Sequence, residues 1–434
     1  MRFFTHPVTC STTVLFTTWI LSTVANAGII DPEKLKVVKD KVVSDTRYFI
    51  KMKSPKTAEK LCVLDDKIKS ASEHIRDGIE KVISFSDFEG FSGNFSPETM
   101  ERISKNPLVS AIVPDSLVRA MDIETQYGAP THLVRLSQPG AVNFGDGDYY
   151  YDDDVQGEGV TAYVIDTGIM IDQPEFEERA FLGPNFSSDA RNIDYVGHGT
   201  HVAGVIGSAT YGVAKKIDIV SIKVLDRFGQ GTLSSVIAGL EFAVNHRQSV
   251  GNPGVANLSL GAARSPVLDE AIEAAFESGL FIVSAAGNSN VDACKTSPAG
   301  SPHAYTVGAI DPRRDRIAGF SNWGQCVDIF ASGVGIESLS NNERDLDERQ
   351  VLTGTSMASP IVCGLVAFEL EKGTPLDDIP SALSDISFKN AIPKSSIMLR
   401  PGSPNKIASS GLTDPDANAQ SIVDAPEQAN STTD

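Results

Sequence analysis

The sequence predicts an α/β protein whose main domain is a parallel sheet with helices on both faces, preceded by a small α+β domain. Downstream of residue 155, short apolar runs alternate with stretches of helical periodicity, a pattern typical of a parallel sheet buried on both sides. Upstream of residue 115, the expected order of elements is β-α-β-β-α-β, which indicates a small two-layer domain. The length of 434 residues exceeds that of one average domain, so we expect two folded units and tails.

The larger domain is expected to span residues 121–400. Its apolar runs, each predicted to be a strand, cover residues 160–165, 217–225, 255–260, 280–286 and 304–310. Its helical stretches cover residues 233–246, 267–278 and 356–370. Residues 401–434 are polar and acidic, and we expect them to form a disordered tail.

The smaller domain is expected to span residues 28–120. The predicted strands and the first helix of this domain cover residues 48–52 (strand), 58–82 (amphipathic helix), 85–95 (a pair of short strands) and 109–113 (strand). Ser96-Pro97-Glu98 opens a second helix, because Ser is a good cap and Pro fits the first turn. Residues 28–115 carry 15 basic and 15 acidic side chains, so the net charge of −19 belongs to the rest of the chain.

Residues 1–27 have the features of a signal peptide. Arg2 gives a positive start, residues 14–24 are mostly apolar, and Ala25-Asn26-Ala27 has the small-x-small form of a signal-peptidase site. The apolar stretch is too short to span a bilayer. A buried N-terminal helix is disfavoured because Thr residues are scattered without helical periodicity. We therefore expect entry into the secretory pathway, with no later membrane anchor.

Composition and charge narrow the classes of partner. Apolar residues make up 41% and charged residues 21%, which suits a globular protein with a core. A chain with 56 acidic and 37 basic side chains would be repelled by nucleic acid and by anionic membrane surfaces, so we expect neither as a partner. We expect a monomer.

Five cysteines have to be placed. Cys10 belongs to the signal peptide and Cys62 to the smaller domain, which leaves Cys294, Cys326 and Cys363. Cys363 lies in an apolar run, so we expect a buried structural thiol. Cys294 and Cys326 are then the candidate disulfide in an oxidising compartment, and their spacing matches no zinc template.

Asp166 and His198 are the first candidates for chemistry. Asp166-Thr167-Gly168 follows a predicted strand, at the edge of the sheet where ligands bind, although an Asp alone could merely cap a turn. His198 comes 32 residues later within Gly197-His198-Gly199-Thr200-His201, where the glycines allow a tight turn into a helix. Two His three residues apart could also indicate a metal, but no further ligand keeps helical register with them.

Ser356 completes the set, 158 residues after His198. Gly354-Thr355-Ser356 leads into an apolar helix and puts Ser356 at its N-terminus, where the helix dipole and free N–H groups favour an oxyanion. A Ser hydroxyl is a weak nucleophile that needs a base, and the base needs an orienting acid. The order Asp, His, Ser therefore predicts nucleophilic hydrolysis.

These three motifs together resemble the signatures of the subtilase family of serine peptidases. Similarity continues across residues 128–372, and residues 211–216, 223–226 and 257–261 resemble the proteinase K and cerevisin branch found in fungi. Residues 47–115 resemble the inhibitory propeptide of these enzymes. The resemblance implies a subtilisin-like fold and a serine endopeptidase, made as a zymogen, that acts on proteins and peptides and needs no cofactor for catalysis.

The resemblance also implies a role for each residue. Asp166 would orient His198, His198 would be general base and then acid, Ser356 would attack the scissile carbonyl, and Asn288 would supply an oxyanion donor. The residues implied to pair with substrate backbone or to line the pocket before the cut are Gly229, Gln230, Gly231, Ser259, Leu260, Gly261, Ala285, Ala286 and Gly287.

Two further family features concern metal and modification. The Pro302 and Ala304 carbonyls with the Asp328 carboxylate match the positions of a structural Ca²⁺ site, although Asp328 is equally consistent with a turn residue. Asn185 and Asn430 begin glycosylation sequons in polar surroundings. Asn257 also begins one, but it lies in a segment implied to bind substrate, so we expect it to be unmodified.

Several positions depart from the family pattern. Ile361 stands where His is usual, Val196 where Asn is usual and Ala262 where a second Gly is usual, and residues 129–133 replace a Pro-Trp-Gly start. Similar departures resemble a sporulation-linked side branch of fungal subtilases. These departures bear on the shape of the cleft, and they do not change the expected reaction.

Two alternatives to a peptidase remain. One is a catalytically silent homologue with a binding or structural role in a cell or spore wall, which would not require all four catalytic positions. The other is an esterase, which is disfavoured because no Gly-x-Ser-x-Gly frames Ser356. We expect an extracellular, vacuolar or wall location, and a propeptide that inhibits the enzyme and is removed by it.

Overall fold

The computed structural model describes residues 47–53, 79–86, 88–105, 109–115, 123–143 and 147–414. The chain divides into two compact units, Met1–Ala120 and Met121–Asp434. The expected signal peptide, the first part of the expected helix 58–82, and residues 415–434 of the expected tail lie outside the described residues.

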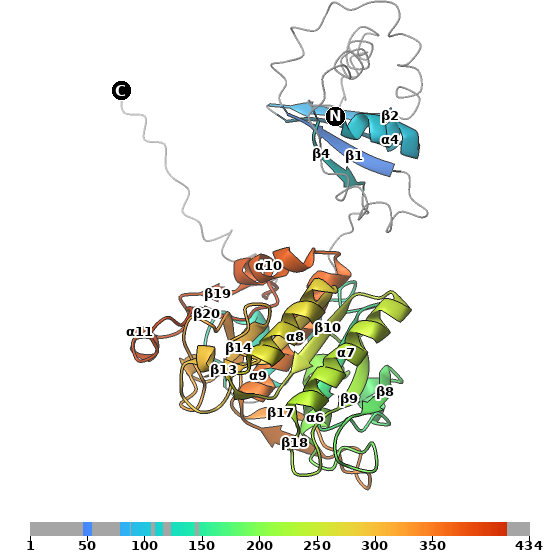
Figure 1. Ribbon diagram of the computed structural model, residues 1–434. Helices are drawn as coiled ribbons and strands as arrows, with labels where there is room; N and C mark the ends of the chain where they lie inside the picture. Colours follow the sequence, from blue (N-terminus) through green and yellow to red (C-terminus); the bar gives the residue numbers. More distant parts are fainter. Residues whose placement is uncertain are drawn as a thin grey trace, which may run out of the picture. The chain divides into compact units, whose positions relative to one another are not determined.

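The first unit contains a four-stranded antiparallel sheet in the order β2-β3-β1-β4 (Figure 1). Its elements are β1 Arg47–Met52, β2 Ile79–Phe85, β3 Phe88–Asn94, α4 Pro97–Ser104 and β4 Val109–Pro114. Ser96 caps α4 by accepting a hydrogen bond from the Thr99 amide, and Pro97 takes the first turn. The core includes Ile50, Phe91 and Ile103.

The end of the expected helix 58–82 is wrong. Residues 79–82 begin strand β2, which pairs with β3 from Ile79 to Phe85. The spacing of Ile79 and Val82 fits a helical turn, but the β-branched side chains at 79, 82 and 83 also suit a strand, and pairing with β3 decides in favour of the strand.

The second unit is built on a long sheet in the order β19-β20-β16-β14-β12-β10-β7-β9-β8, with β15 paired to β14. The pairs from β16 to β8 along this order are parallel. The strands are β7 Thr161–Asp166, β8 Ala180–Asn185, β9 Asp218–Lys223, β10 Gly254–Leu258, β12 Leu280–Ala285, β14 Tyr305–Asp311, β15 Arg316–Ile317, β16 Ile329–Ser332, β19 Phe388–Lys389 and β20 Lys406–Ile407.

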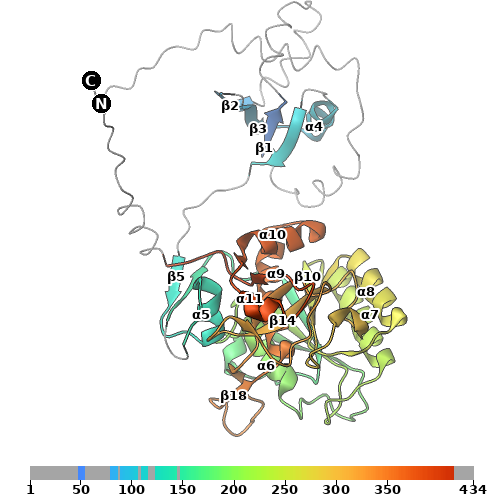
Figure 2. The same ribbon diagram turned by 90° about the vertical axis from the view of Figure 1, so that its left-hand side faces the viewer.

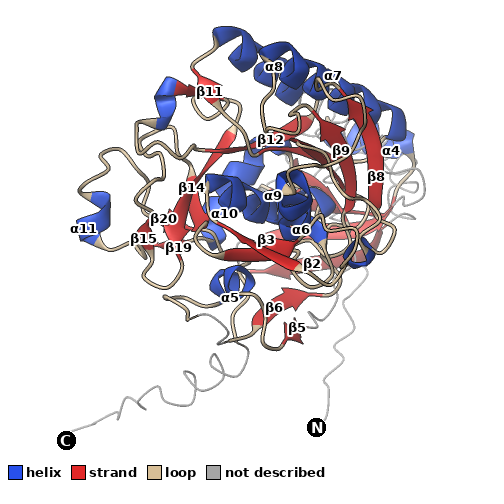
Figure 3. Ribbon diagram, turned by 90° about the horizontal axis from the view of Figure 1, so that it is seen from below, coloured by secondary structure: helices blue, strands red, loops and turns tan. Residues whose placement is uncertain are grey.

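Helices cover both faces of this sheet, as the sequence predicts (Figure 3). The helices are α5 Thr131–Ser137, α6 His198–Gly207, α7 Leu233–Val250, α8 Pro266–Glu277, α9 Thr355–Glu371, α10 Ile379–Ile386 and α11 Lys394–Ile397. Ala162 and Val164 of β7 share a core with α6 and α9, whereas Tyr163 and Ile165 share one with α7 and α8. Alternate side chains of one continuous apolar strand therefore fill two cores.

Short elements complete the second unit. They are β5 Ile123–Gln126 with β6 Tyr149–Asp152 beside α5 (Figure 2), β11 Ala262–Ala263 with β13 Thr296–Ser297, β17 Ile336–Leu339 with β18 Arg349–Leu352, and 3₁₀ turns at Pro174–Phe176, Ala293–Lys295 and Leu376–Asp378. Among the described residues, none of the helices has the length and apolar character needed to cross a membrane.

The second unit continues beyond residue 400, where we expected a disordered tail to begin. Ile407 is fully buried and pairs with Phe330 of β16, and the Ser409 hydroxyl donates to the Leu136 carbonyl. A two-residue strand set among small polar residues has no apolar periodicity, so composition places the boundary too early.

Candidate active site

Asp166 is the last residue of β7 and is fully buried. Its carboxylate oxygen Oδ1 accepts a hydrogen bond from the Thr167 amide at 2.7 Å. Parallel strands that end at one edge of a sheet deliver polar side chains to a common site. The turn that follows β7 therefore helps to fix the orientation of the Asp166 carboxylate.

His198 is the first residue of α6. Gly197 before it has φ +84°, and a Cβ on Gly199 after it would lie 2.0 Å from the Gly168 carbonyl oxygen. This close approach requires glycine at position 199 and brings α6 against the turn that follows Asp166. His198 Nδ1 lies 2.7 Å from Asp166 Oδ1. Because the carboxylate accepts there, Nδ1 donates and the neutral ring keeps its lone pair on Nε2.

Burial lowers the pKa of His198, but the charge and hydrogen bond of Asp166, together with the charge of Asp194, raise it more, so the pKa lies above its ordinary 6.5. Stabilisation of the imidazolium by a buried carboxylate is what a general base requires when it takes a proton.

Asp194 is a supporting residue that our sequence analysis missed. Its Oδ1 accepts from the Thr167 hydroxyl at 2.8 Å, and that hydroxyl accepts from the Gly199 amide at 2.9 Å. Its Oδ2 accepts from the amide and hydroxyl of Thr200. Asp194 therefore links the turn after Asp166 to the start of α6. The sequence signal that could have identified Asp194 is an acidic residue shortly before a predicted helix start.

Ser356 lies in the first turn of α9, which is preceded by Gly354. The Ser356 hydroxyl donates to the Ser259 carbonyl oxygen at 3.3 Å. Asn288 lies near the same helix start, where its Oδ1 accepts from the Thr355 amide at 2.8 Å and from the Thr355 hydroxyl at 2.9 Å. Because Oδ1 is already bonded to Thr355, the Nδ2 group of Asn288 is the one left to donate a hydrogen bond into the pocket.

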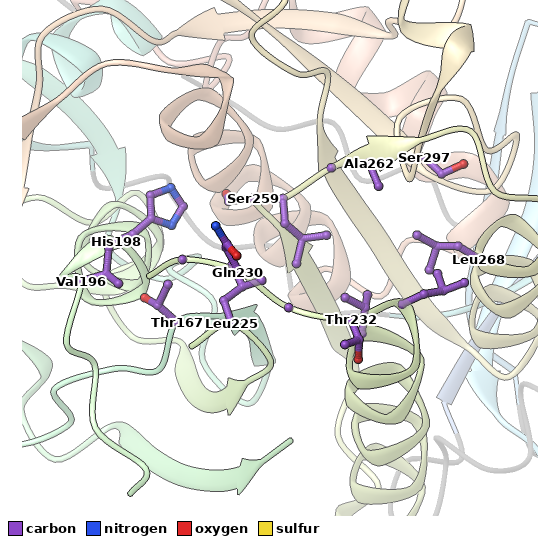
Figure 4. A pocket seen from close by; sticks show the side chains of 16 residues that line it. Thr167, Val196, His198, Leu225, Gln230, Thr232, Ser259, Ala262, Leu268 and Ser297 are labelled. Carbon is purple, nitrogen blue, oxygen red and sulfur yellow. The ribbon is translucent and has the colours of Figure 1, made fainter. Parts of the chain in front are cut away.

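Two adjoining pockets meet at the segment that contains Leu260, Gly261 and Ala262. The larger, of about 610 Å³, extends from His198 to Leu268 (Figure 4), and the smaller, of about 380 Å³, contains Asn288 and Ser356. The larger pocket is lined by the expected residues Gly229, Gln230, Gly231, Ser259, Leu260 and Gly261, and the smaller by Ala285, Ala286 and Gly287 together with Leu260 and Gly261. Val196, one of the departures from the family pattern, also lines the larger pocket.

The three cysteines of the second unit form one disulfide and one free thiol. Cys294 and Cys326 form a disulfide with Cα atoms 5.3 Å apart, and Cys294 lies two residues before the wall residue Thr296. Cys363 is a buried free thiol in α9, and burial raises its pKa.

Asp328 lies beside the segment that contains the other two expected calcium ligands. The Asp328 Oδ2 atom accepts from the Thr306 amide at 2.7 Å, close to the turn that contains Pro302 and Ala304. Burial raises the pKa of Asp328 to about 6, so a bound cation would stabilise its ionised form. Within the described part of the chain, no three His, Cys, Asp or Glu side chains form a metal-binding group.

The sequons differ in environment. Asn257 is fully buried, and the Asn185 amide donates to the Asp189 carbonyl at 2.8 Å. Asn430 lies outside the described residues.

Comparison with known proteins identifies relatives of both units. Residues 157–394 match the model of the subtilase family, and residues 47–121 match that of the peptidase inhibitor I9 family. The subtilase-type proteinase RRT12 of Saccharomyces cerevisiae is 37% identical, over 89% of this chain and 88% of its own length. Cerevisin of the same yeast is 43% identical, over 72% of this chain and half of its own length.

A solved structure supports the same relationship. The chain resembles the crystal structure of a cold adapted subtilisin-like serine proteinase, with a TM-score of 0.59 and 40% sequence identity. The match covers 65% of this chain and 98% of the solved one.

Proposed function

This chain belongs to the subtilase family of serine peptidases and carries an I9 inhibitor domain, and we propose that it is an endopeptidase acting through Asp166, His198 and Ser356. The observation that carries the proposal is the 2.7 Å bond from His198 Nδ1 to the buried Asp166 carboxylate, at one end of a pocket that adjoins Ser356. A buried acid, a base with a free Nε2 and a Ser at a helix start are the parts that acyl transfer needs.

The reaction follows from these positions. The imidazole Nε2 takes the Ser356 proton as Oγ attacks the scissile carbonyl, and Asp166 stabilises the imidazolium that forms. The new oxyanion would be bound by Asn288 Nδ2 and by the Ser356 amide at the start of α9. The imidazolium then gives its proton to the leaving amine, and water hydrolyses the acyl-enzyme by the reverse route.

The larger pocket supports binding of an extended peptide. Residues 229–231 and 259–261 line it as two backbone segments, and pairing with backbone selects an extended chain rather than a particular sequence. The smaller pocket has Ala285, Ala286 and Gly287 in its wall. It would accept an apolar side chain from the substrate residue that precedes the cleaved bond.

We propose that residues 28–120 act as an inhibitory propeptide that the enzyme removes itself. The match of residues 47–121 to an inhibitor family supports inhibition. Cleavage within the same molecule would proceed at an effective concentration that separate substrates do not reach. Entry into the secretory pathway, an extracellular, vacuolar or wall location, and a structural Ca²⁺ at Asp328 are further parts of the proposal.

A fluorophosphonate probe separates this proposal from a silent homologue. The mature protein is expected to react once per molecule, at Ser356, and to cleave an unfolded protein substrate. Ser356→Ala should neither react nor cleave, whereas Ser249→Ala, at an exposed hydroxyl on α7, should do both. Wild-type protein that remains unlabelled would favour the binding role.

A further inference from the structure

Helix α9 contains a proline one turn after the proposed nucleophile. In an α-helix, the carbonyl of residue 356 accepts its hydrogen bond from the N–H of residue 360. Pro360 has no N–H, so the Ser356 carbonyl lacks its regular helical donor. A buried carbonyl without a donor costs free energy, so another group is needed.

The donor is the side chain of Ser259, which follows β10 and is 97 residues away in the sequence. Its hydroxyl donates to the Ser356 carbonyl oxygen at 2.8 Å. In return, the Ser356 hydroxyl donates to the Ser259 carbonyl oxygen at 3.3 Å. The two serines are thus joined by a reciprocal pair of bonds, each from a side chain to the other's backbone.

The Ser259 hydroxyl is held by one buried side chain, Asn257, and lies against another, Ser359. Asn257 Nδ2 donates to it at 2.9 Å, and the Ser359 hydroxyl lies 2.9 Å from it. Ser359 in turn donates to Asn257 Oδ1 at 3.0 Å. Asn257 and Ser359 are fully buried and Ser259 is 4% exposed, so water does not compete for these bonds.

We propose that Ser259 is a positioning residue whose hydroxyl replaces the helical N–H missing at Pro360 and so fixes the backbone of Ser356 relative to the substrate-pairing segment 259–261. This inference rests on the proposed role of Ser356 as nucleophile. It assigns the Ser259 side chain a task separate from pairing with substrate backbone.

The two bonds of the pair behave differently during the reaction. The Ser356 hydroxyl has to leave the Ser259 carbonyl in order to give its proton to His198. The bond from the Ser259 hydroxyl to the Ser356 carbonyl can persist through that step. It would keep the nucleophile's backbone, and the Ser356 amide beside it, in position while the oxyanion forms.

Removing the hydroxyl should therefore lower kcat more than it changes KM. For Ser259→Ala we expect a fall in kcat of about tenfold or more, with KM within about twofold, because the Ser356 carbonyl loses its donor. Ser359→Ala is the matched control, since it removes a neighbouring hydroxyl that does not bond to Ser356, and its loss of kcat should be several-fold smaller.

The sharper test restores the missing N–H. Pro360→Ala provides a backbone donor to the Ser356 carbonyl, so Ser259→Ala/Pro360→Ala should recover most of the kcat lost in Ser259→Ala. Pro360→Ala alone is expected to keep kcat within about twofold of wild type. If the double variant is no better than Ser259→Ala, or if the loss in Ser259→Ala falls on KM, the inference is wrong.

Active molecules in each preparation are counted by fluorophosphonate titration, so kcat refers to folded enzyme. If Ser259→Ala does not fold, the same cycle is run with Ser259→Cys, whose S–H is a weak donor of similar shape. Failure of wild-type protein to label at Ser356 would overturn the proposed function, whereas normal labelling with no coupling between positions 259 and 360 would overturn this inference alone.

Discussion

The two halves of the site are built from different interactions. Around His198, the stabilising groups are charged: Asp166 and Asp194 are buried carboxylates, and the buried Lys223 ammonium donates to the Thr167 carbonyl at 2.7 Å. Around Ser356, the bonds are neutral and come from Asn288, Thr355 and Ser259.

The halves also differ in how far apart their parts lie in the sequence. Asp166 and His198 are separated by 32 residues, whereas the bonds to Thr355 and Ser356 reach back 67 and 97 residues. The charged half consists of β7, its turn and α6, together with Lys223 from the neighbouring strand β9. The neutral half depends on three crossovers of the sheet being in place.

This difference suggests a division of labour. Charge–dipole and charge–charge contacts set the basicity of His198, which, as the proposed general base, would change its protonation state during the reaction. Neutral hydrogen bonds hold Ser356 and Asn288, whose positions should then be insensitive to pH. The predictions below test whether the two halves can be perturbed separately.

The largest effect is expected in the neutral half, from Ser356→Ala. Cleavage of a peptide substrate should fall roughly 10⁶-fold, a magnitude established with subtilisin itself. Because we propose self-processing, the variant should also accumulate as a longer precursor that lacks only residues 1–27. Mass spectrometry of the product made in a host without related proteases measures this. Maturation to the wild-type N-terminus would show that another protease performs the cut.

In the charged half, Asp166→Asn should lower kcat roughly 10⁴-fold, because an amide neither fixes the correct imidazole tautomer nor stabilises the imidazolium. Thermal melting provides the folding check. Titration with a fluorophosphonate should still reach one site per molecule, but far more slowly than in wild type. A loss below tenfold would mean that Asp166 is not the orienting acid.

Asn288→Ala tests the neutral half without touching the nucleophile. We expect kcat to fall roughly 10²–10³-fold with little change in KM, the size known for the equivalent amide in subtilisin. Because Asn288 Oδ1 also anchors Thr355, Asn288→Asp is the informative partner variant: it keeps that acceptor but loses the Nδ2 donor. Near-wild-type turnover in Asn288→Asp would assign Asn288 an anchoring role only.

Much of the site could be predicted because local turn chemistry marks it. Asp166, His198 and Ser356 each stand at a strand end or helix start within two residues of a glycine, and one close approach of this kind is seen at Gly199. The residues that support them leave no comparable signal. Asp194 acts through Thr167, and Ser259 acts on a carbonyl left without a donor by Pro360, a relation that exists only once β10 and α9 are side by side.

The fold was predictable to a similar degree. Long apolar runs such as that of β7 predict buried strands. Helices α7, α8 and α9 agree with their predicted ranges to within a few residues. Strand β20, with two residues, and the β2 segment are decided by their partners in the sheet. Their sequences alone fit other structures equally well.

The smallest expected effect is a shift in the pH dependence of kcat/KM. This measurement distinguishes the charged half from the neutral half most directly. Because the pKa of His198 is raised above 6.5 and the base must be neutral, kcat/KM should fall as pH drops through a midpoint above 6.5. Asn288→Ala, in the neutral half, should leave that midpoint within about 0.2 units of wild type, whereas Asp166→Asn should move it downwards by about one unit or more. Proton NMR of His198 in the mature wild-type protein, without substrate, gives the same pKa without turnover. The raised pKa also predicts that protonated His198 stabilises the fold fully below pH 6.5, and that this contribution is lost as pH rises through the folded-state value. If Asn288→Ala shifts the midpoint as much as Asp166→Asn does, the two halves are coupled and the division of labour fails.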